Sequence, residues 1–298
     1  MMKPQKIGSL MALLIGLVCL GVPGAHGAQP WELARQMTGA DGRTRLEQPL
    51  ELGFDAVNRR YFVVDGRHGV LMSFDEEGGR LAAFNAGGQI RKPVDLLLID
   101  ANRLWVADRS LNQLLYIDVQ EKQVRAFSIR HPNGDLVFVD RLDRDRQSRL
   151  LVLDRLSGAI LVLDDNLQVS QTLAGGKEFQ GFSDFKVKED GIWALDGLQR
   201  RVYHFDGQGR LQKTIVLAGE LSFPVAIEVD ESGTLYILDR HAGDVRTFDA
   251  QGRFKAAFLV KGKREGQLWY PAALAFDWAR RLCVVDEGNA RIQIYERK

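Results

Sequence analysis

Cysteine is almost absent from this chain, which has two in 298 residues. One of them, Cys19, lies in an N-terminal segment that we expect to be removed, so the remaining Cys283 can form no intrachain disulfide. The core must then hold the fold without covalent cross-links. Because no base lies near Cys283 in its own apolar segment, we expect a buried, unreactive thiol.

The chain also lacks an excess of either charge, with 40 Lys and Arg against 39 Asp and Glu and a net charge of +1. This balance argues against nucleic-acid binding driven by bulk positive charge, and no nucleic-acid partner is expected. A content of 45% hydrophobic and 27% charged residues is typical of a soluble globular protein. It excludes a disordered, collagen-like or polytopic membrane chain.

Several catalytic signatures are missing as well. The sequence has no Gly-x-Ser-x-Gly elbow, no phosphate-binding Gly-x-x-x-x-Gly-Lys-Ser/Thr loop, no Cys-x-x-Cys, with or without a following His, and no His-Glu-x-x-His. These absences argue against the common hydrolase, nucleotide-binding, redox and metalloprotease chemistries. No cofactor is expected.

The N-terminus has the pattern of a signal peptide. Lys3 and Lys6 precede an apolar run over residues 10–22, and small residues around Ala25 and Gly27 provide a cleavage site after Gly27. The apolar run is shorter than the roughly 20 residues that span a bilayer. An uncleaved anchor is the alternative, and the bulky Val18 disfavours lipidation of Cys19. We therefore expect an exported protein, periplasmic or extracellular, with no membrane span after cleavage of residues 1–27.

What the sequence does contain is an internal repeat. A short apolar run ends in Asp six times, and nine residues after each Asp comes a large apolar residue followed by an acid. The spacing between successive Asp residues varies from 42 to 47. A constant spacing within units and a variable spacing between them indicates one rigid hairpin with elastic connections. The six Asp residues are Asp65, Asp108, Asp154, Asp196, Asp239 and Asp286.

Each unit is predicted to form four strands. The fifth unit has apolar or β-branched runs at 223–230, 234–238, 245–248 and 254–260, separated by turns rich in Gly and Asp. Four strands per unit of this length is the period of a propeller blade. The sequence thus predicts an all-β fold, a six-bladed β-propeller of four-stranded antiparallel blades in one domain over residues 28–298.

The way in which the ring closes is also predicted. The chain stops just after the third strand of the sixth unit. Residues 31–38 precede the first unit and resemble the fourth strands of the repeated units rather than their first strands. Closure removes the exposed sheet edges that an open array would leave. We therefore expect 28–47 to provide the closing strand and the loop after it, and 48–298 to hold six repeats.

The last repeat carries a resemblance to a known family. Its segment Val284 to Tyr295 is similar to the apolar-Asp-x-Gly-Asn-x-Arg-Ile-x-Val-Phe pattern of NHL-repeat β-propellers, and Phe-Pro at 223–224 and Tyr-Pro at 270–271 match the family's strand openings. Asn289 has no equivalent in the other repeats. The resemblance implies a binding platform for proteins, RNA or ligands, although related six-bladed propellers include an amidating lyase and metal-using lactonase-type hydrolases.

The first strand of each blade lines the central channel, so its opening residues are candidates for chemistry. Glu51, Asp95, Asp140 and Asp184 are predicted at the channel mouth in blades one to four, where blades five and six have alanines. Such acids could bind Ca²⁺ or provide a base of raised pKa. The alternative is that they are solvated loop acids without a common target. For the six repeated Asp residues we expect a structural role, accepting backbone N–H bonds in the loops.

Histidines offer a second candidate site. His68, His131 and His241 are predicted on loops of one face and could bind Zn²⁺, whereas His204 falls in a third strand and is expected to be structural. The alternative for the first three is dispersed surface histidines, because none has the short spacing of a metal site.

Arginines mark the same face. Arg109, Arg155 and Arg240 follow the repeated Asp directly and Arg67 lies two residues after it, so the four are candidates for binding an acidic partner. The alternative is that they pair with neighbouring loop acids.

Together these features favour a monomeric, non-enzymatic binding or scaffold protein whose loop face holds a protein, peptide or glycan. The alternative is a metal-dependent lyase or lactonase-like hydrolase acting at the channel mouth, for which Ca²⁺ or Zn²⁺ would be required.

Overall fold

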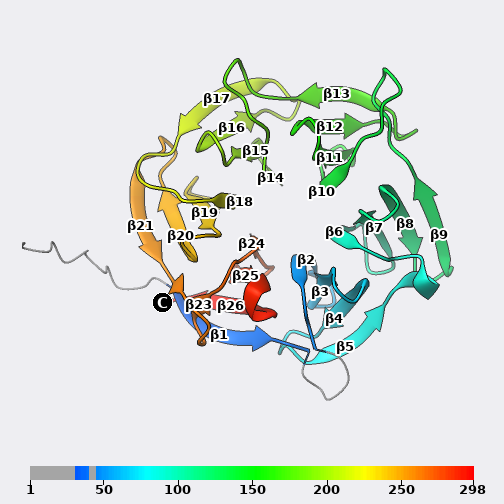
Figure 1. Cartoon of the computed structure of the whole chain (residues 1–298), viewed down its shortest axis with the longest axis horizontal. Coiled ribbons are helices and arrows are strands. Elements are labelled where there is room, and N and C mark those ends of the chain that lie inside the picture. The colour runs from blue at the N-terminus through cyan, green and yellow to red at the C-terminus, as the bar shows by residue number, and fades with distance from the viewer. Residues whose placement is uncertain (1–30, 40–44) are drawn as a thin grey trace, which may run out of the picture.

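The computed structural model describes residues 31–39 and 45–298, and the predicted signal peptide lies outside them. The chain forms six four-stranded antiparallel sheets that surround a central channel as blades (Figure 1). The prediction of an all-β, six-bladed propeller is confirmed. In the part that the structure describes, no helix is long and apolar enough to cross a membrane.

Within the first three blades the strands follow one another from the channel to the rim. Blade one consists of β2 (Pro49–Asp55), β3 (Arg60–Asp65), β4 (Val70–Phe74) and β5 (Arg80–Phe84). Blade two consists of β6 (Pro93–Leu98), β7 (Arg103–Asp108), β8 (Gln113–Asp118) and β9 (Gln123–Phe127). Blade three consists of β10 (Val139–Arg144), β11 (Leu150–Asp154), β12 (Ile160–Leu163) and β13 (Val169–Leu173).

The fourth and fifth blades repeat this order, and the sixth takes its outer strand from the N-terminal segment. Blade four consists of β14 (Asp184–Lys188), β15 (Gly191–Asp196), β16 (Arg201–Phe205) and β17 (Leu211–Val216). Blade five consists of β18 (Pro224–Val229), β19 (Leu235–Asp239), β20 (Asp244–Phe248) and β21 (Phe254–Phe258). Blade six consists of β24 (Ala273–Phe276), β25 (Leu282–Asp286), β26 (Arg291–Arg297) and β1 (Trp31–Met37).

Three small elements lie in the connections. A short parallel pair, β22 (Val260–Lys261) with β23 (Gln267–Leu268), joins blades five and six. The 3₁₀ helix η1 (Ala86–Gly88) joins blades one and two, and η2 (Glu287–Asn289) lies between β25 and β26.

The core lies between neighbouring blades. Every residue of β11 is buried, because this second strand is covered on both faces by adjacent sheets. Its Leu151 and Leu153 pack with Phe185 of blade four, whereas the alternating pattern of the outer strand β13 leaves every second residue exposed. Inner strands are therefore continuously apolar because both of their faces are covered, whereas outer strands alternate between buried and exposed residues because one face meets solvent.

The ring closes as the sequence predicts. β1 pairs antiparallel with β26, from Trp31 opposite Arg297 to Met37 opposite Ile292, with a bulge between Leu33 and Arg35. Figure 1 shows this blue strand at the outer edge of the red blade six. Met37 is fully buried in the cluster between blades six and one, and Trp31 in the cluster between blades five and six. The closing strand thus supports both interfaces of the last blade.

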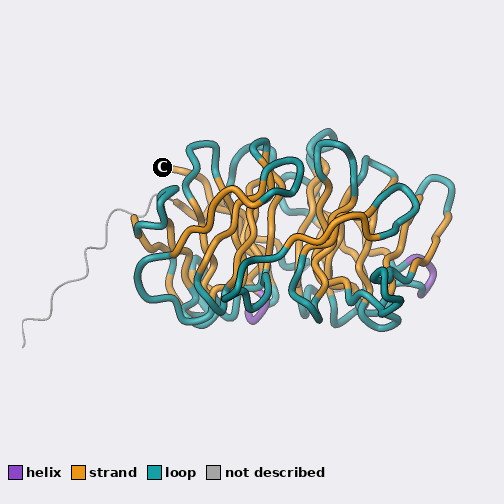
Figure 2. The backbone as a smooth tube through the Cα atoms, turned by 90° about the horizontal axis from the view of Figure 1, so that it is seen from above, coloured by secondary structure: helices purple, strands orange, loops and turns teal. Residues whose placement is uncertain are grey.

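The disc has two distinct faces (Figure 2). One is formed by the loops between second and third strands, together with the connections from blade to blade, and both 3₁₀ helices lie on it, at the lower side of Figure 2. We call it the loop face, defined by residues 66–69, 109–112, 155–159, 197–200, 240–243 and 287–290.

Candidate binding surface and channel

The six repeated Asp residues build the loop face. Each is at most 4% exposed. Asp154, for example, accepts hydrogen bonds from the N–H groups of Phe138 at 2.9 Å and Ser157 at 3.0 Å, and from the Ser157 hydroxyl at 2.6 Å. One carboxylate therefore joins the segment that enters the blade to the hairpin loop. Asp65 makes the same connection between Glu47 and His68, which confirms the predicted structural role.

The channel mouth has the predicted residues in five blades out of six. Glu51, Asp95 and Asp184 line a cavity of about 270 Å³ in the channel. Alanines occupy the equivalent positions in blades five and six, where Ala226 and Ala273 are each 1% exposed.

In blade three the prediction is wrong by one residue. The first strands of blades one, two and three share a register shift at this place, and Val139, opposite Asp154, corresponds to Pro49 and Pro93. Arg141, opposite Leu153, therefore occupies the position of Glu51 and Asp95. Asp140 sits at this irregularity, outside the channel, and accepts hydrogen bonds from Arg109. A cation therefore stands where the sequence predicted a fourth acid.

Arg141 and Lys186 neutralise part of the channel charge. The Nε atom of Arg141 lies 3.6 Å from Oε2 of Glu51 and 3.9 Å from Oδ1 of Asp184, and Nζ of Lys186 lies 3.4 Å from Asp184 Oδ2. Lys186 was not predicted, because only the residues that open the first strands were considered and Lys186 lies two residues further along the same strand, on the same side as Asp184. Asp143, Lys188 and Glu228 line the same cavity and were missed for the same reason.

Carboxylates also join neighbouring blades across the channel wall. The innermost strands of adjacent blades share no sheet, but Asp95 Oδ2 accepts from the N–H of Leu142 at 2.7 Å in the next blade. Asp184 does the same for Ile227 at 3.0 Å. Asp143 and Glu228 bond in this way to Val187 and Phe276. Four of the five channel acids are thus interblade supports.

Glu51 is the exception. Its Oε1 accepts from the N–H of Leu52 in its own strand, and its buried Oε2 has no hydrogen-bond partner among the described residues. Burial raises the pKa of the Glu51 carboxyl, an effect that Lys186 and Arg141 oppose. Burial and the nearby Glu51 raise the pKa of Asp95 well above its ordinary value.

The structure does not bring the three candidate histidines together. His68 Nδ1 lies 2.9 Å from Asp65 and His131 Nε2 lies 3.3 Å from Asp154, in different blades, while the His241 ring stacks on Phe223. Among residues 31–39 and 45–298, no group of three or more His, Cys, Asp or Glu side chains is arranged to hold a metal ion.

His204 lies in the third strand β16, as predicted. Its ring stacks on Trp193 with centroids 4.2 Å apart, and its Nε2 lies 3.2 Å from the carbonyl oxygen of Asp190. These contacts fit the expected structural role.

Three of the four candidate arginines pair with neighbouring acids. Arg67 lies 3.6 Å from Glu47, and Arg240 lies 2.7 Å from Glu287; Arg109 pairs with Asp140. Arg155 is exposed and makes no side-chain hydrogen bond or ion pair with any other described residue. The loop face is therefore less cationic than the sequence alone suggests.

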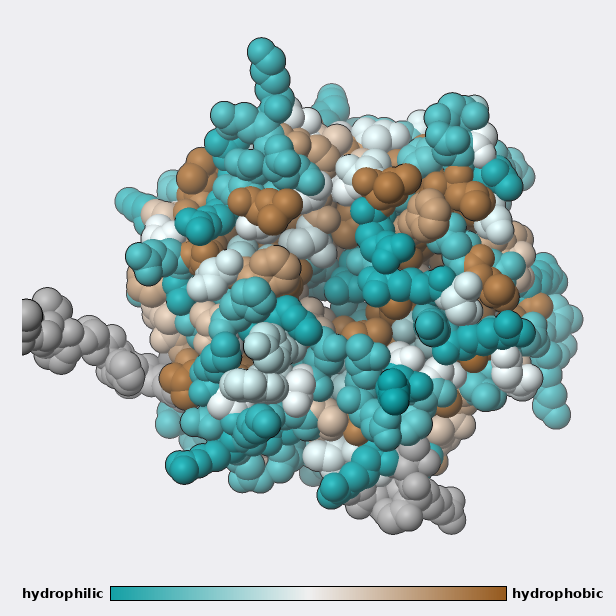
Figure 3. All heavy atoms as spheres, viewed as in Figure 1, coloured by the Kyte–Doolittle hydropathy of each residue, from teal (hydrophilic) through white to brown (hydrophobic). Residues whose placement is uncertain are grey.

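Exposed apolar side chains on the loop face are the feature that the sequence analysis missed. Leu156 is 76% exposed, Leu198 71% and Leu111 51%, all at the tips of hairpin loops in consecutive blades. Figure 3 views this face and shows hydrophobic side chains on it. A groove of about 290 Å³, which we call the loop groove, lies between Leu156 and Leu198. It is lined by Arg155, Leu156, Phe182, Leu198, Phe223 and Val225.

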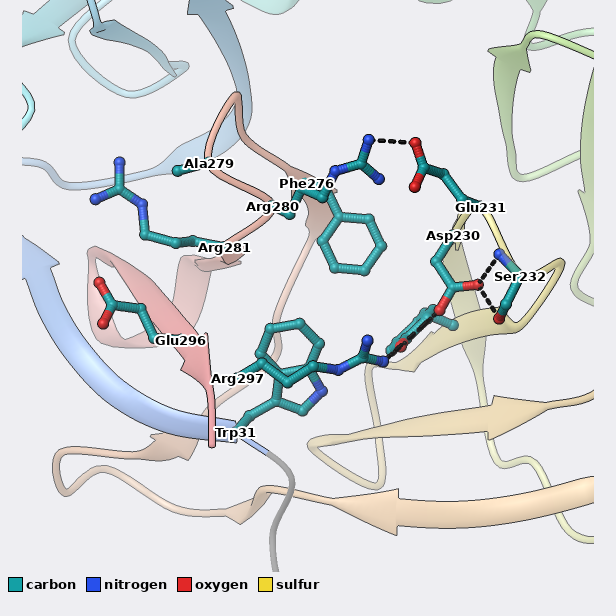
Figure 4. Close-up of a pocket in the computed structure, with 11 residues that line it drawn as sticks. Trp31, Asp230, Glu231, Ser232, Phe276, Ala279, Arg280, Arg281, Glu296 and Arg297 are labelled. Atoms are coloured by element: carbon teal, nitrogen blue, oxygen red, sulfur yellow. Dashed lines mark hydrogen bonds and ion pairs between the residues drawn. The ribbon is translucent and has the colours of Figure 1, made fainter.

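A cavity of about 590 Å³ lies on the opposite face, at the closing seam (Figure 4). Its aromatic wall contains Trp31, which stacks on Phe276 with ring centroids 5.9 Å apart. Its cations are paired: Arg280 with Glu231, and Arg297 with the Tyr236 hydroxyl at 2.9 Å. The arrangement holds the closing strand in place and leaves none of these cations unpaired.

Comparisons with known proteins agree with this geometry. The model of the NHL repeat matches residues 268–295, the last blade. Over 99 residues, or 33% of this chain, the sequence is 29% identical to Protein brain tumor of Drosophila melanogaster, of which the match spans 9%. The chain is a six-bladed β-propeller whose last blade matches the NHL repeat.

Solved structures show the same fold. A streptogramin B lyase superposes with a TM-score of 0.68 at 8% identity, covering 90% of this chain and 98% of the lyase. Virginiamycin B lyase from Staphylococcus aureus gives 0.64 at 10% identity, covering 89% and 99%. At such identities the likeness shows the architecture alone.

The structure explains why the NHL pattern is kept in the last blade and changed in others. In blade six, Asn289 Nδ2 donates to Asp286 at 2.8 Å, and Arg291 donates to Asp286 and to the carbonyl oxygens of Arg264 and Gln267. These bonds hold the connection that contains β22 and β23. At the position of Asn289, His68 and Ser157 bond to their own Asp in blades one and three. Different side chains thus meet one structural requirement.

Proposed function

We propose that this NHL propeller is an exported, non-enzymatic binding or scaffold protein that holds a partner on its loop face. The observation that carries the proposal is the exposure of Leu156 and Leu198 at the rim of the loop groove, 76% and 71%. A leucine at a hairpin tip gains nothing for folding from such exposure. Contiguous apolar surface rimmed by polar groups is typical of an interaction site.

The four arginines take a smaller part than the sequence suggested. Arg67, Arg109 and Arg240 are held by neighbouring acids, so they position loops and contribute little net charge to a partner. Arg155 stands free beside Leu156 at the loop groove. We therefore assign the main attraction to apolar contact, with Arg155 adding charge at its edge.

Affinity capture from the exported fraction of the native host tests the proposal. Wild-type protein is expected to retain a partner that Leu156→Asp/Leu198→Asp loses, because a buried carboxylate opposes apolar contact. Val57→Asp/Val119→Asp is the matched control, since both valines are exposed in turns of the opposite face, 90% and 46%. Equal capture by all three proteins, or loss from the control as well, contradicts the proposal.

Export rests on the N-terminal sequence. The exported protein is expected to begin at Ala28, which N-terminal sequencing of the secreted or periplasmic form determines. A protein that keeps residues 1–27 and stays with the membrane fraction contradicts the predicted cleavage.

A second candidate, an enzyme acting at the channel mouth, is favoured by Glu51. Its unpartnered Oε2 faces a channel cavity, and burial raises its pKa, which are properties of a general acid or base. Stoichiometric Ca²⁺ or Zn²⁺ in the purified protein would favour a metal-dependent enzyme. Metal-free protein whose Glu51→Gln variant keeps full partner binding and biological function contradicts it.

A further inference from the structure

A continuous row of aromatic rings crosses the loop face from blade five to blade six. The Phe223 and His241 rings stack with centroids 4.7 Å apart and planes 20° from parallel. His241 then meets Tyr270 edge-on at 6.1 Å, and Tyr270 meets Trp269 edge-on at 5.2 Å. Phe223 and Tyr270 are 41% and 37% exposed. Four rings from three connections therefore form one surface, which we call the aromatic row.

The aromatic row is accompanied by lysines without carboxylate partners. Lys261 Nζ lies 5.3 Å from the ring centroids of both Trp269 and Tyr270, and Lys263 Nζ lies 5.3 Å from that of Trp269. Both lysines are exposed, and neither forms an ion pair with an acid of the described part of the chain. The ring faces attract these cations and hold them at the surface. This edge of the loop face is therefore positive and open.

Phe223 belongs both to the aromatic row and to the wall of the loop groove. The loop groove thus continues into the aromatic row without interruption, from Leu156 in blade three to Tyr270 beside blade six. Arg155 stands at one end of this path and Lys261 and Lys263 stand at the other. An occupant of the whole path meets an apolar centre with positive charge at both ends.

We infer that this path binds an extended, acidic segment of a partner protein, with one large apolar side chain in the loop groove and carboxylates beside Arg155 and the two lysines. The inference rests on the proposed function and names its partner chemistry. A peptide fits better than a glycan, because the exposed surface at the centre of the path is leucine and phenylalanine, which cannot bond to sugar hydroxyls. Charge complementarity selects an acidic rather than a basic segment.

Selection of random linear peptides displayed on phage against the folded wild-type protein tests the inference. The enriched peptides are expected to carry Asp or Glu on both sides of a Leu, Phe or Trp. Synthetic fluorescent copies are then titrated by anisotropy. Affinity is expected to fall about tenfold in Lys261→Glu/Lys263→Glu, because two exposed attractive charges become repulsive, and to weaken as salt rises.

The matched control is Lys122→Glu/Arg125→Glu, which reverses two exposed charges in the turn between β8 and β9 and in β9 itself. It is expected to leave peptide affinity unchanged. Lys263→Glu alone serves as a second variant, because Lys263 makes no hydrogen bond with a described residue and its replacement leaves the loop bonds intact. A thermal melt of each variant verifies that it folds.

The outcomes separate this inference from the proposed function. Basic or uncharged peptides, no enriched peptide, or binding that survives the lysine reversals overturns the inference. Specific binding to an array of acidic glycans in place of peptides overturns it as well. In these cases the proposed function still stands if Leu156→Asp/Leu198→Asp abolishes capture of the partner. Indifference to the leucine and lysine changes alike overturns both.

Discussion

At the scale of the residue, Glu51 differs from the other carboxylates of the channel. Asp95, Asp143, Asp184 and Glu228 each accept a hydrogen bond from a backbone N–H of the next blade. Glu51 Oε2 accepts no hydrogen bond from a described residue, and its charge is opposed only by those of Lys186 and of Arg141, whose Nε lies 3.6 Å away. A buried carboxylate with one unmet oxygen opposes folding when it is ionised.

Glu51→Gln is therefore expected to stabilise the protein at neutral and higher pH. Because burial raises the pKa of Glu51 in the folded state, stability falls as pH rises from the ordinary value of 4.5 through the folded pKa. The amide cannot ionise, so the variant loses this decline. At pH 8 we expect Tm to rise by about 2 °C or more, the shift that roughly 1 kcal/mol produces in a large domain.

Thermal melts from pH 4 to pH 8 measure the effect. The exposed Glu189→Gln, whose side chain is 95% exposed, is the control and is expected to follow the wild type throughout. A Glu51→Gln variant that is less stable than the wild type at pH 8 would show that the ion pair with Arg141 outweighs the cost of burial.

At the scale of the element, the hairpin between second and third strands is the part that the sequence describes best. A buried Asp at the end of the second strand fixes both the loop and the segment entering the blade, so its position cannot shift by a residue. The first strands are less constrained. Blade three has no proline at the position of Pro49 and Pro93, so its sequence does not show which residue is equivalent, and Arg141 rather than Asp140 takes the channel position.

Asp154→Ala tests the structural role of the repeated Asp. Truncation leaves the N–H groups of Phe138, Leu156 and Ser157 without an acceptor, and we expect a loss of roughly 3 kcal/mol or more in the free energy of unfolding. Asp154→Asn keeps one acceptor oxygen and should lose less. Urea denaturation measures both.

The control is Asp164→Ala, in an exposed turn where the carboxylate accepts from Asn166 and Gln168. Its expected cost is about 1 kcal/mol, because water replaces the lost acceptor. If Asp154→Ala costs no more than Asp164→Ala, the buried Asp does not hold the loop face together.

At the scale of the whole molecule, the repeat and its missing last strand were sufficient to predict the ring and its closure by residues 31–38. The binding surface was harder to predict, because the ion pairs of its arginines and the exposure of its leucines depend on residues of the neighbouring blade. Glu47 and Glu287, which hold Arg67 and Arg240, lie in connections outside the repeated pattern. Leu156 and Leu198 lie two residues after the repeated Asp, where the other blades have Arg67, Ser110, His241 and Gly288, and only the packed structure shows that the two leucines remain exposed.

Closure by the N-terminal strand leads to a prediction about the stability of the entire ring. Glu32 and Glu296 are paired across β1 and β26, and both are exposed, so Glu32→Cys/Glu296→Cys places two thiols at opposite positions of the closing ladder. The buried Cys283 is not available to either thiol. An oxidised pair would cross-link the two ends of the propeller and restrict the unfolded chain. We expect a gain of about 2–4 kcal/mol in the free energy of unfolding, lost on reduction.

Denaturation with and without dithiothreitol measures the gain. Glu77→Cys/Glu296→Cys, which pairs one end of the chain with a turn of blade one, is the control. Because Glu32 sits opposite Glu296 only when β1 completes blade six, failure of the first pair to oxidise would show that another segment closes the ring.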